Sequence, residues 1–453
     1  MNAQRPYQLP EPMICEPINN LTYELVNRFI TKHSTRLQRY TYLEQMYKGF
    51  HNVYQLPDKP DWKPDNRMAI NYPRYITETF LGYAYGIPIK ESHPDEAVNE
   101  AMRDFQNDNE LSDHEYELFQ NVCIYGHAFE YLYQDEEAHT RMTVCTPKEL
   151  FIVYDDTVRN RALFAVRYAR HETDGNQSEL FGEVLTREQI IRFDKGKFTE
   201  TLDNPYNMIP VVEYVMNRQR IGLYENVTGL IEVYNRVIGE KANDVESFAE
   251  AYMKLIGGVV DEEDLKKIRE NRIINIPTYG DMPGTTVDFM AKPTADTTQE
   301  NLLDRLDRQI YQISMVANIS DESFGNATSG TALAYKLQAM SNLASGFDRK
   351  IEKSLRKRYK IWSTLKTNVS DESAWKELQV VTSRNLPKNR MEEAQTAAQL
   401  SGIVSHETQL SLLSIVSDPK EELEKIEKEQ AAEPLMDFDD HDHAAEDGGY
   451  GIQ

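Results

Sequence analysis

The longest unbroken helical pattern in the chain, between residues 331 and 367, limits the possible folds more than any other feature. Apolar side chains recur there every three or four residues, which is the period of one helix face. The members of this stripe are Leu333, Leu337, Met340, Ala344, Phe347, Ile351, Leu355, Tyr359 and Trp362. About 37 residues at a rise of about 1.5 Å each extend roughly 55 Å. We therefore expect one very long helix here.

Two shorter helical patterns precede the long helix, at residues 225–256 and 297–315. Each has an apolar stripe along one face, which needs a neighbouring surface to bury it. Gly257 and Gly258 are expected to end the first pattern. The insert that follows reads as a small α/β element, with a helix at 262–270 and strands at 272–276 and 286–290. The sequence thus predicts a helical pair joined by a small insert.

The N-terminal half combines both kinds of secondary structure. Helical patterns cover residues 19–48, 75–85 and 96–120, whereas residues 121–215 contain β-rich stretches separated by Gly, Asn and Asp turns. We expect an α+β fold, mainly helical, with a mostly antiparallel sheet. Residues 1–18 are expected to form a flexible arm, and residues 431–453 a disordered acidic tail. A length of 453 residues predicts about two to four domains.

The charge balance excludes one broad class of protein. The chain carries 50 Lys and Arg against 74 Asp and Glu, a formal charge of −24. A protein whose whole surface wraps nucleic acid needs a basic surface for the phosphates, so that class is excluded. A protein past which DNA must slide without sticking remains compatible with this charge.

The cysteines and the hydropathy pattern bear on the compartment. The three cysteines lie far apart in the sequence, and an odd number argues against a disulfide framework, which favours a reducing compartment. The polar, proline-bearing start lacks a signal-peptide core, and no run approaches the roughly 18–20 apolar residues of a membrane span. We expect a protein that is cytosolic or assembles in a cytosol.

A search for catalytic chemistry finds no complete site. Residues 325–331 have the glycine spacing of a phosphate loop, but Thr331 stands where the motif needs Lys. A loop whose Thr328 or Ser329 caps the following helix is the better interpretation. His441 and His443, in the acidic tail, could hold a metal ion only weakly because nothing fixes their geometry. We predict no enzyme activity, no cofactor and no metal site.

Charge is distributed unevenly along the chain. Residues 331–367 carry nine Lys and Arg against two acids, whereas residues 418–453 carry thirteen acids against three Lys. Three interpretations of the basic helix remain open: a solvated helix face, a band of salt bridges to neighbouring subunits, or a DNA contact. The residues assigned to the inter-subunit band are Arg349, Lys350, Lys353, Arg356 and Lys357.

The order of these parts resembles the portal proteins of tailed double-stranded DNA bacteriophages, in the branch typical of siphophages of Gram-positive hosts. Short segments carry the resemblance, and their ordered set between about residues 20 and 430 is more specific than any one of them. The segments are NYPRYI at 71–76, GYAYGIPI at 82–89, IEVYNR at 231–236, NDVE at 243–246, NISDESFG at 318–325, SGTAL at 329–333, RNLP at 384–387, GIVSHET at 402–408 and DP at 418–419.

The resemblance implies a ring of usually about twelve copies around a central DNA tunnel. It divides the chain into a wing at 19–225, a stem helix at 226–257, a clip at 258–295, a second stem helix at 296–315, a tunnel loop at 316–330, the long helix at 331–367, a wing strand at 368–387 and a crown at 388–430. The implied location is a capsid vertex of the virion, assembled in the host cytoplasm.

The resemblance also implies partners and functional residues. The partners are the terminase large subunit, a head-completion or adaptor protein, the major capsid and scaffolding proteins, and double-stranded DNA. The tunnel-loop residues would be Asn318, Ser320, Asp321, Glu322, Phe324, Gly325, Asn326, Ala327 and Thr328. The clip residues facing terminase or adaptor would be Asp261, Glu262, Glu263, Lys266, Lys267, Arg269, Tyr279 and Asp281.

Two alternatives remain at this stage. The chain could be another structural component of a phage head or connector, or a nucleic-acid enzyme, for which the residues name no nucleophile, base or metal. Electron microscopy separates the possibilities, because a ring with a central hole favours the portal.

A first prediction concerns the loop at 318–330, which contains no Lys or Arg and two acids, Asp321 and Glu322. A loop that binds DNA for affinity should be basic, whereas one that brushes moving DNA should not. Deleting residues 325–328 should leave the ring intact and impair packaging or retention of DNA. Changing both acids to Lys should make rings bind duplex DNA in a salt-sensitive way. A deletion variant that packages and retains DNA like the parent would show that the loop is only a connector.

Overall fold

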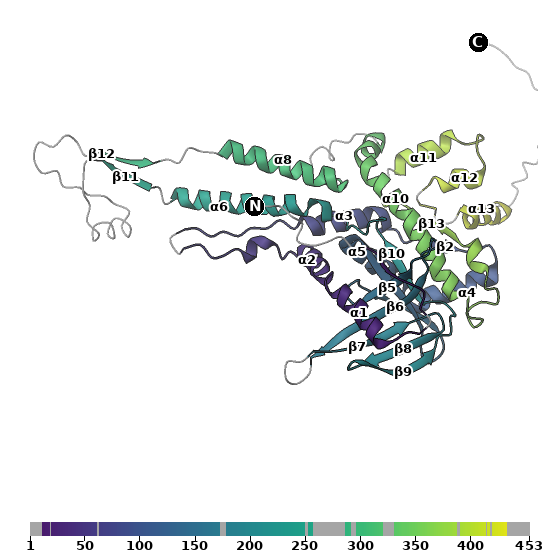
Figure 1. Ribbon diagram of the computed structural model, residues 1–453. Coiled ribbons are helices and arrows are strands. Elements are labelled where there is room, and N and C mark those ends of the chain that lie inside the picture. Colours follow the sequence, from purple (N-terminus) through teal and green to yellow (C-terminus); the bar gives the residue numbers. More distant parts are fainter. Residues whose placement is uncertain are drawn as a thin grey trace, which may run out of the picture. The chain divides into compact units, whose positions relative to one another are not determined.

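The computed structural model describes residues 11–18, 20–60, 63–172, 178–249, 252–256, 286–290, 296–319, 330–386, 390–413, 415–416 and 419–432. The chain divides into two compact units, Met1–Asn385 and Leu386–Gln453 (Figure 1). The first unit combines helices and sheets, which confirms the α+β prediction. Among the described residues, no helix is both long and apolar enough to span a membrane.

The β-rich segment forms two sheets. The larger has the strand order β1-β5-β6-β7-β8-β9, and the smaller has the order β10-β3-β4. Neighbouring strands are antiparallel except for β1, which pairs with β5 in parallel. The strands are β1 (Met13–Cys15), β3 (His127–Gln134), β4 (Thr140–Cys145), β5 (Leu150–Asp155), β6 (Ala162–Glu172), β7 (Ser178–Leu185), β8 (Gln189–Asp194), β9 (Lys197–Asp203) and β10 (Val211–Val215).

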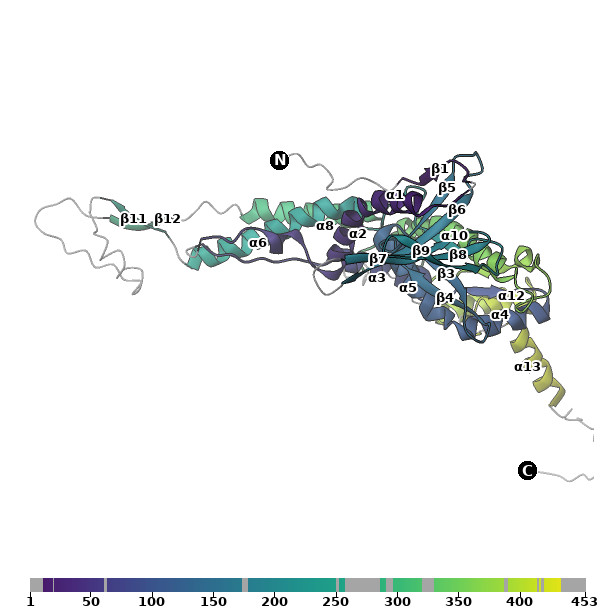
Figure 2. The ribbon, with the colours of Figure 1, turned by 60° about the horizontal axis from the view of Figure 1, so that its bottom comes forward.

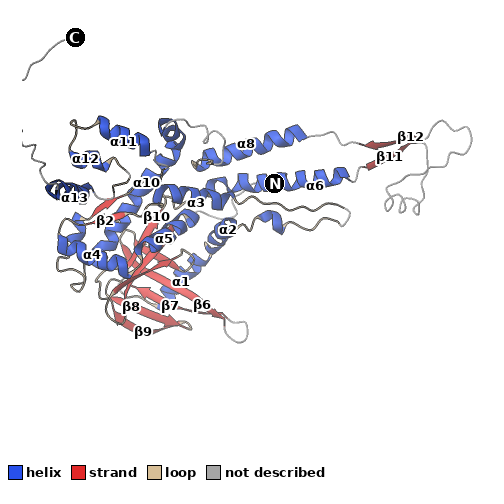
Figure 3. Ribbon diagram, turned by 180° about the vertical axis from the view of Figure 1, so that it is seen from behind, coloured by secondary structure: helices blue, strands red, loops and turns tan. Residues whose placement is uncertain are grey.

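Strand β5 shows why the larger sheet is covered on both faces. Its apolar run is uninterrupted, and successive side chains of a strand point to opposite faces. Phe151 and Val153 pack with α1 (Tyr23–Ser34), whereas Leu150 and Ile152 pack with residues of the smaller sheet. The sheet therefore lies between a helix and a second sheet, and Figure 3 shows the strands β5–β9 of the larger sheet gathered in one region.

Helices cover the rest of this core. They are α2 (Leu37–Lys48), α3 (Tyr72–Tyr85), α4 (Glu96–Asp108) and α5 (Leu111–Tyr125). Their starts follow from local chemistry: the Asn71 side chain accepts a hydrogen bond from the backbone amide of Arg74 at the start of α3, and Asp95 caps α4 in the same way. A short strand β2 (Lys90–Ser92) pairs with β13 (Gln379–Val381), which joins this region to a much later part of the chain.

The predicted helical pair is present as α6 (Thr228–Ala249) and α8 (Asp296–Ser314), which lie side by side (Figure 2). A single helical turn, η2 (Glu225–Val227), leads into α6. The first helix is shorter than expected, because it ends at Ala249 and residues 252–256 form strand β11 instead. This strand pairs with β12 (Thr286–Met290), one of the two strands predicted in the insert. A short apolar run does not distinguish helix from strand until a pairing partner is known.

The long helix α10 (Gly330–Trp362) contains 33 residues and ends five residues before the predicted position. The Asn368 side chain accounts for the early end, because its amide Nδ2 donates to the Trp362 carbonyl oxygen at 2.8 Å. A helical turn, η3 (Ala374–Glu377), and strand β13 follow. Along α10 the predicted apolar stripe is buried from Leu337 to Trp362.

Two further expectations are tested by individual elements. The arm at 1–18 is not flexible throughout, because Met13–Cys15 form β1 and Met13 is buried in the core. The second unit contains α11 (Arg390–Gln399), α12 (His406–Ser411) and α13 (Pro419–Ala432), so the first two residues of the tail predicted at 431–453 are helical. The predicted helix at 262–270, the strand at 272–276 and most of the tail lie outside the described residues.

Candidate functional site

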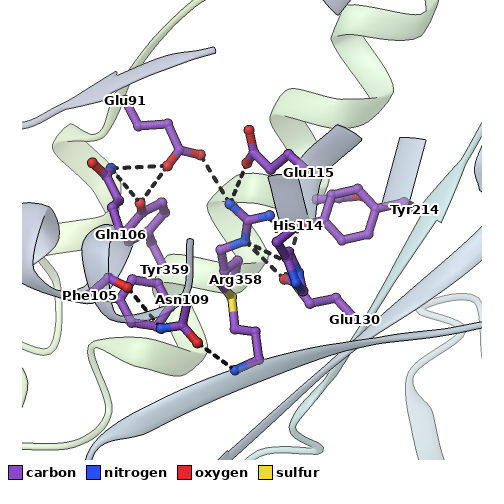
Figure 4. A network of polar contacts seen from close by, with 12 residues as sticks. Glu91, Phe105, Gln106, Asn109, His114, Glu115, Glu130, Tyr214, Arg358 and Tyr359 are labelled. Carbon is purple, nitrogen blue, oxygen red and sulfur yellow. Dashed lines mark hydrogen bonds and ion pairs between the residues drawn. The ribbon is translucent and has the colours of Figure 1, made fainter. Parts of the chain in front are cut away.

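The inner face of α10 carries a charged residue inside its apolar stripe. Ile351 and Leu355 are buried at four-residue spacing, and the next buried position on this face is Arg358, whose side chain is 0% exposed. Figure 4 shows its guanidinium surrounded by carboxylates from other parts of the fold. A fully buried charge is costly unless it is paired and hydrogen-bonded, so its partners decide whether α10 can pack there.

Three glutamates from three different elements bind this guanidinium. Glu130 on β3 accepts from Nε at 2.9 Å and from Nη2 at 2.8 Å. Glu115 on α5 accepts from Nη1 at 2.6 Å, and Glu91 on β2 lies 3.3 Å from the same nitrogen. Bidentate guanidinium–carboxylate pairs are both strong and directional. Arg358 therefore ties the long helix to the smaller sheet, to α5 and to the β2–β13 pair.

The remaining oxygen atoms of the cluster also have partners. The Tyr359 hydroxyl donates to Glu91 at 2.5 Å, and the Gln106 amide donates to Glu91 at 3.2 Å. The Tyr214 hydroxyl donates to Glu130 at 3.1 Å, and the His114 Nε2 atom lies 2.9 Å from Glu130. A buried polar network stabilises a fold only when its members are satisfied, and this network meets that condition.

The three carboxyl groups do not share the same protonation state. Burial, together with the neighbouring Glu91, raises the pKa of Glu115 to about 8, against the opposite effect of Arg358. Burial alone would also raise the pKa of Glu130, but Arg358 and His114 outweigh it and lower that pKa to about 2. At neutral pH Glu130 is therefore the charged partner of Arg358, whereas Glu115 holds a proton.

The outer face of α10 forms a basic cavity of about 580 Å³. We use the name basic cavity for the hollow lined by Glu213, Arg349, Glu352, Lys353, Ser354, Arg356, Lys357, Lys360 and Trp375. The ammonium nitrogen of Lys360 lies 5.1 Å from the centre of the Trp375 ring, a cation–π contact. Five cations against two carboxylates make this surface positive inside a protein of net negative charge.

Both carboxylates that line the basic cavity already have partners, Glu213 outside the lining and Glu352 within it. Glu213 accepts from the Nε and Nη2 atoms of Arg220 at 2.6 and 2.8 Å, and Glu352 pairs with Arg356 at 2.9 Å. Lys357 donates to the Val211 carbonyl oxygen at 2.9 Å. Burial lowers the pKa of Lys357 to about 8, and Lys353 and Lys360 lower it as well, which outweighs the opposite effect of Glu213. Positive charge in the cavity thus exceeds the negative charge available to it.

The structure brings together four of the five residues predicted for the basic band. Arg349, Lys353, Arg356 and Lys357 line the basic cavity, whereas Lys350 is not among its lining residues. Arg358, one of the nine Lys and Arg counted on residues 331–367, does not belong to this face, because it points inward and is neutralised there. Of the tunnel-loop residues only Asn318 is described, and its neighbour Ile319 donates its amide to the Tyr75 hydroxyl at 2.9 Å. The other tunnel-loop residues and all the clip residues lie outside the described residues.

Sequence reasoning missed the Arg358 cluster, although a signal for it exists. Position 358 continues the three-to-four spacing of the apolar stripe on α10, and Glu130 interrupts the apolar run of β3. A charge at a position that periodicity marks as buried predicts a buried partner of opposite sign. The identity of that partner could not be read, because Arg358 and Glu130 are 228 residues apart.

The amino-acid sequence of the chain matches a family of known proteins. A model of the family described as "Phage portal protein, SPP1 Gp6-like" matches residues 26–434. The portal protein of Bacillus phage SPP1 is 22% identical in an alignment that covers 97% of this chain and 94% of that protein. The portal protein of Clostridium phage phiCD119 is 25% identical in an alignment that covers 83% of this chain and 88% of that protein. A chain from the structure titled "Neck of empty GTA particle computed with C6 symmetry" aligns with 83% of this chain and 93% of its own length, at 12% identity and a TM-score of 0.43.

The Arg358 cluster generates a second prediction, about pH and stability. Because the folded-state pKa of Glu115 is about 8, above its ordinary value, the folded protein binds more protons than the unfolded chain between about pH 4.5 and 8. This contribution to stability is therefore present at acidic pH and lost as the pH rises towards 8. Glu115→Gln should remove the loss, so the variant should melt at a higher temperature than the parent at pH 8.5 and at a similar one at pH 5.

Glu130→Gln is the matched control for that prediction. The pKa of Glu130 is low because its charged form binds Arg358. Removing this charge should therefore lower the free energy of unfolding by about 3–5 kcal/mol at pH 7. Equal destabilisation of both variants at pH 8.5 would contradict the assignment of the proton to Glu115.

Proposed function

Because the chain belongs to the SPP1 Gp6-like family of phage portal proteins, we propose that its copies assemble into a ring of about twelve around a DNA tunnel. The observation that carries this proposal is the family match over residues 26–434, which includes the helical pair α6 and α8. In the proposed ring, the sheets and α1–α5 form the wing. Helices α6 and α8 form the stem, and the insert between them forms the clip. Helices α11–α13 form the crown.

The outer face of α8 supports assembly with neighbouring copies. Leu303, Leu306 and Ile310 are buried, but the same apolar stripe also contains Leu302 and Ile313, which are 42% and 50% exposed. The stripe is thus wider than the surface that the rest of the chain covers. Apolar surface left open on an elongated helical pair is typical of a protein–protein contact.

The proposed tunnel carries double-stranded DNA during packaging and ejection. A formal charge of −24 repels phosphates, so a duplex inside the ring is not held by counterion release. The tunnel loop around Asn318–Thr328 would face this duplex, and the clip would face the terminase large subunit during packaging and a head-completion protein afterwards. The location that follows is one capsid vertex of the virion, in contact with capsid and scaffolding proteins.

The basic cavity on α10 supports the inter-subunit interpretation of the basic band. Its carboxylates are already paired, Glu213 with Arg220 and Glu352 with Arg356, so the cations outnumber the carboxylates of the lining and the excess can pair with acidic side chains of another copy. A neighbouring copy of a strongly acidic protein offers many such side chains. We therefore assign Arg349, Lys353, Arg356 and Lys357 to salt bridges between neighbouring subunits, with Lys360 added to the set.

A third prediction tests ring assembly through the stem. Leu302→Asp combined with Ile313→Glu places two carboxylates on the open apolar stripe and should raise the protein concentration needed for assembly at least about tenfold. Light scattering and electron microscopy at several concentrations measure this change.

The control for that prediction alters the neighbouring residues by the same charge. Asn301→Asp combined with Gln312→Glu changes exposed polar positions of the same helix and should leave assembly as in the parent. A parent protein that stays monomeric at micromolar concentration and at several ionic strengths would contradict the ring itself.

A fourth prediction concerns the basic cavity. Arg349→Glu combined with Lys353→Glu should weaken the rings, and the difference from the parent should shrink at high salt because screening reduces exposed charge–charge contacts. Lys366→Glu, an exposed position outside the cavity, is the control. Rings of unchanged stability would favour a solvated face, and intact rings with altered DNA retention would favour a DNA contact.

A further inference from the structure

The loop between α2 and α3 runs along the stem helix α6 (Figure 1). We call residues 50–60 and 63–71 the α2–α3 loop. Polar contacts hold it in place: the Asn52 amide donates to Glu232 at 3.4 Å, and Lys59 donates to Glu240 at 2.8 Å. A single helical turn, η1 (Asn52–Gln55), lies within it, and Val53 is buried. The loop is thus an ordered layer against α6.

A row of three residues on α6 receives the returning half of this loop. Asn235 and Asn243 accept hydrogen bonds from the backbone amides of Ile70 and Asn66, at 2.9 and 2.6 Å. Gly239 lies midway between them, and a Cβ atom there would stand 3.0 Å from the Asn66 carbonyl oxygen. Residues four apart share one helix face, so the row Asn235–Gly239–Asn243 forms a seat for an extended backbone.

The apolar side chains of the α2–α3 loop point away from the fold. Five large ones are between 38% and 64% exposed, although the loop is ordered against a helix: Phe50, Tyr54, Leu56, Met68 and Ile70. Several of its charged side chains are meanwhile paired: Arg67 binds Asp58 and Asp65, each at 2.7 Å, and Lys59 binds Glu240. Intramolecular packing does not explain so much open apolar surface in so short a segment, and a surface with its charges paired suits a protein partner better than nucleic acid.

The open apolar stripe of α8 belongs to a different face of the same stem. Helix α6 packs against α8 on one side and against the α2–α3 loop on another, and Figure 1 shows α6 between the two. The outermost layers of the stem are therefore the loop, with its five apolar side chains, and α8, with Leu302 and Ile313. Copies that close into a ring need two different, complementary surfaces that face opposite neighbours.

We propose that the α2–α3 loop of one copy binds the outer face of α8 of a second copy, so that the layers of neighbouring stems alternate around the ring. The occupant of each surface is another copy of this chain, because both apolar surfaces belong to one stem and the described residues of that stem cover neither. This pairing rests on the proposed ring and names the two surfaces that build it.

Two variants with one damaged surface each test the pairing. Tyr54→Asp with Met68→Asp damages the loop, and Leu302→Asp with Ile313→Glu damages α8. Each variant alone should fail to form rings at concentrations where the parent forms them. An equimolar mixture should form dimers of about twice the 52.5 kDa mass of one copy, because one intact loop meets one intact α8 and no further surface is left. Light scattering measures all three samples, and Gln55→Asp, next to Tyr54, is the control that should assemble normally.

The outcomes separate this inference from the ring proposal. A loop variant that forms rings like the parent overturns the pairing and leaves the ring intact, whereas a parent that forms no rings overturns the proposed function. The contact is also tested directly by photo-cross-linking from a benzophenone amino acid in place of Tyr54. A mixture of isotopically light and heavy copies distinguishes cross-links between two copies from those within one copy. Light–heavy cross-links to residues 296–315 are expected. Cross-links only elsewhere, or none, would overturn the pairing whatever the mixed variants do.

Discussion

The fold of the first unit depends on one buried guanidinium. Arg358 lies in the apolar stripe of the longest helix, and it is compatible with burial only because Glu130, Glu115 and Glu91 converge on it. Removing one partner of a buried ion pair typically costs about 3–5 kcal/mol, since the other charge stays behind without compensation. The pair therefore fixes the position of α10 against the smaller sheet, and with it the direction of the basic cavity on the opposite face of that helix.

Polar contacts of the same kind position the helical pair α6 and α8. Arg39 on α2 donates to both oxygens of Glu225, the residue that begins the turn before α6, at 2.8 and 2.5 Å. The Tyr72 hydroxyl on α3 donates to Asp307 on α8 at 2.6 Å. Directional bonds between fully or partly buried groups specify an angle that apolar packing alone leaves adjustable. Helices α6 and α8 are thus connected to α2 and α3 by groups with defined geometry.

The distribution of charge and apolar surface fits an assembly better than an isolated chain. The α2–α3 loop and α8 leave large apolar side chains open, and the basic cavity has more cations than carboxylates. A single copy gains nothing from these features, since open apolar surface and unbalanced charge both favour contacts with another molecule. In the proposed ring, a neighbouring copy would be the partner for both.

The sequence by itself determined the helices that have a regular apolar period and the family that an ordered set of motifs identifies. The stripe from Leu337 to Trp362 predicted α10, the stripe on 297–315 predicted α8, and the ordered segments identified the family. Only the tertiary structure decided the rest. Residues 252–256 form a strand because Thr286–Met290 pairs with them. Arg358 points into the fold because Glu130 binds it there. Periodicity reports which face a side chain occupies, but the group that meets it there comes from a distant part of the chain, and no local pattern encodes that meeting.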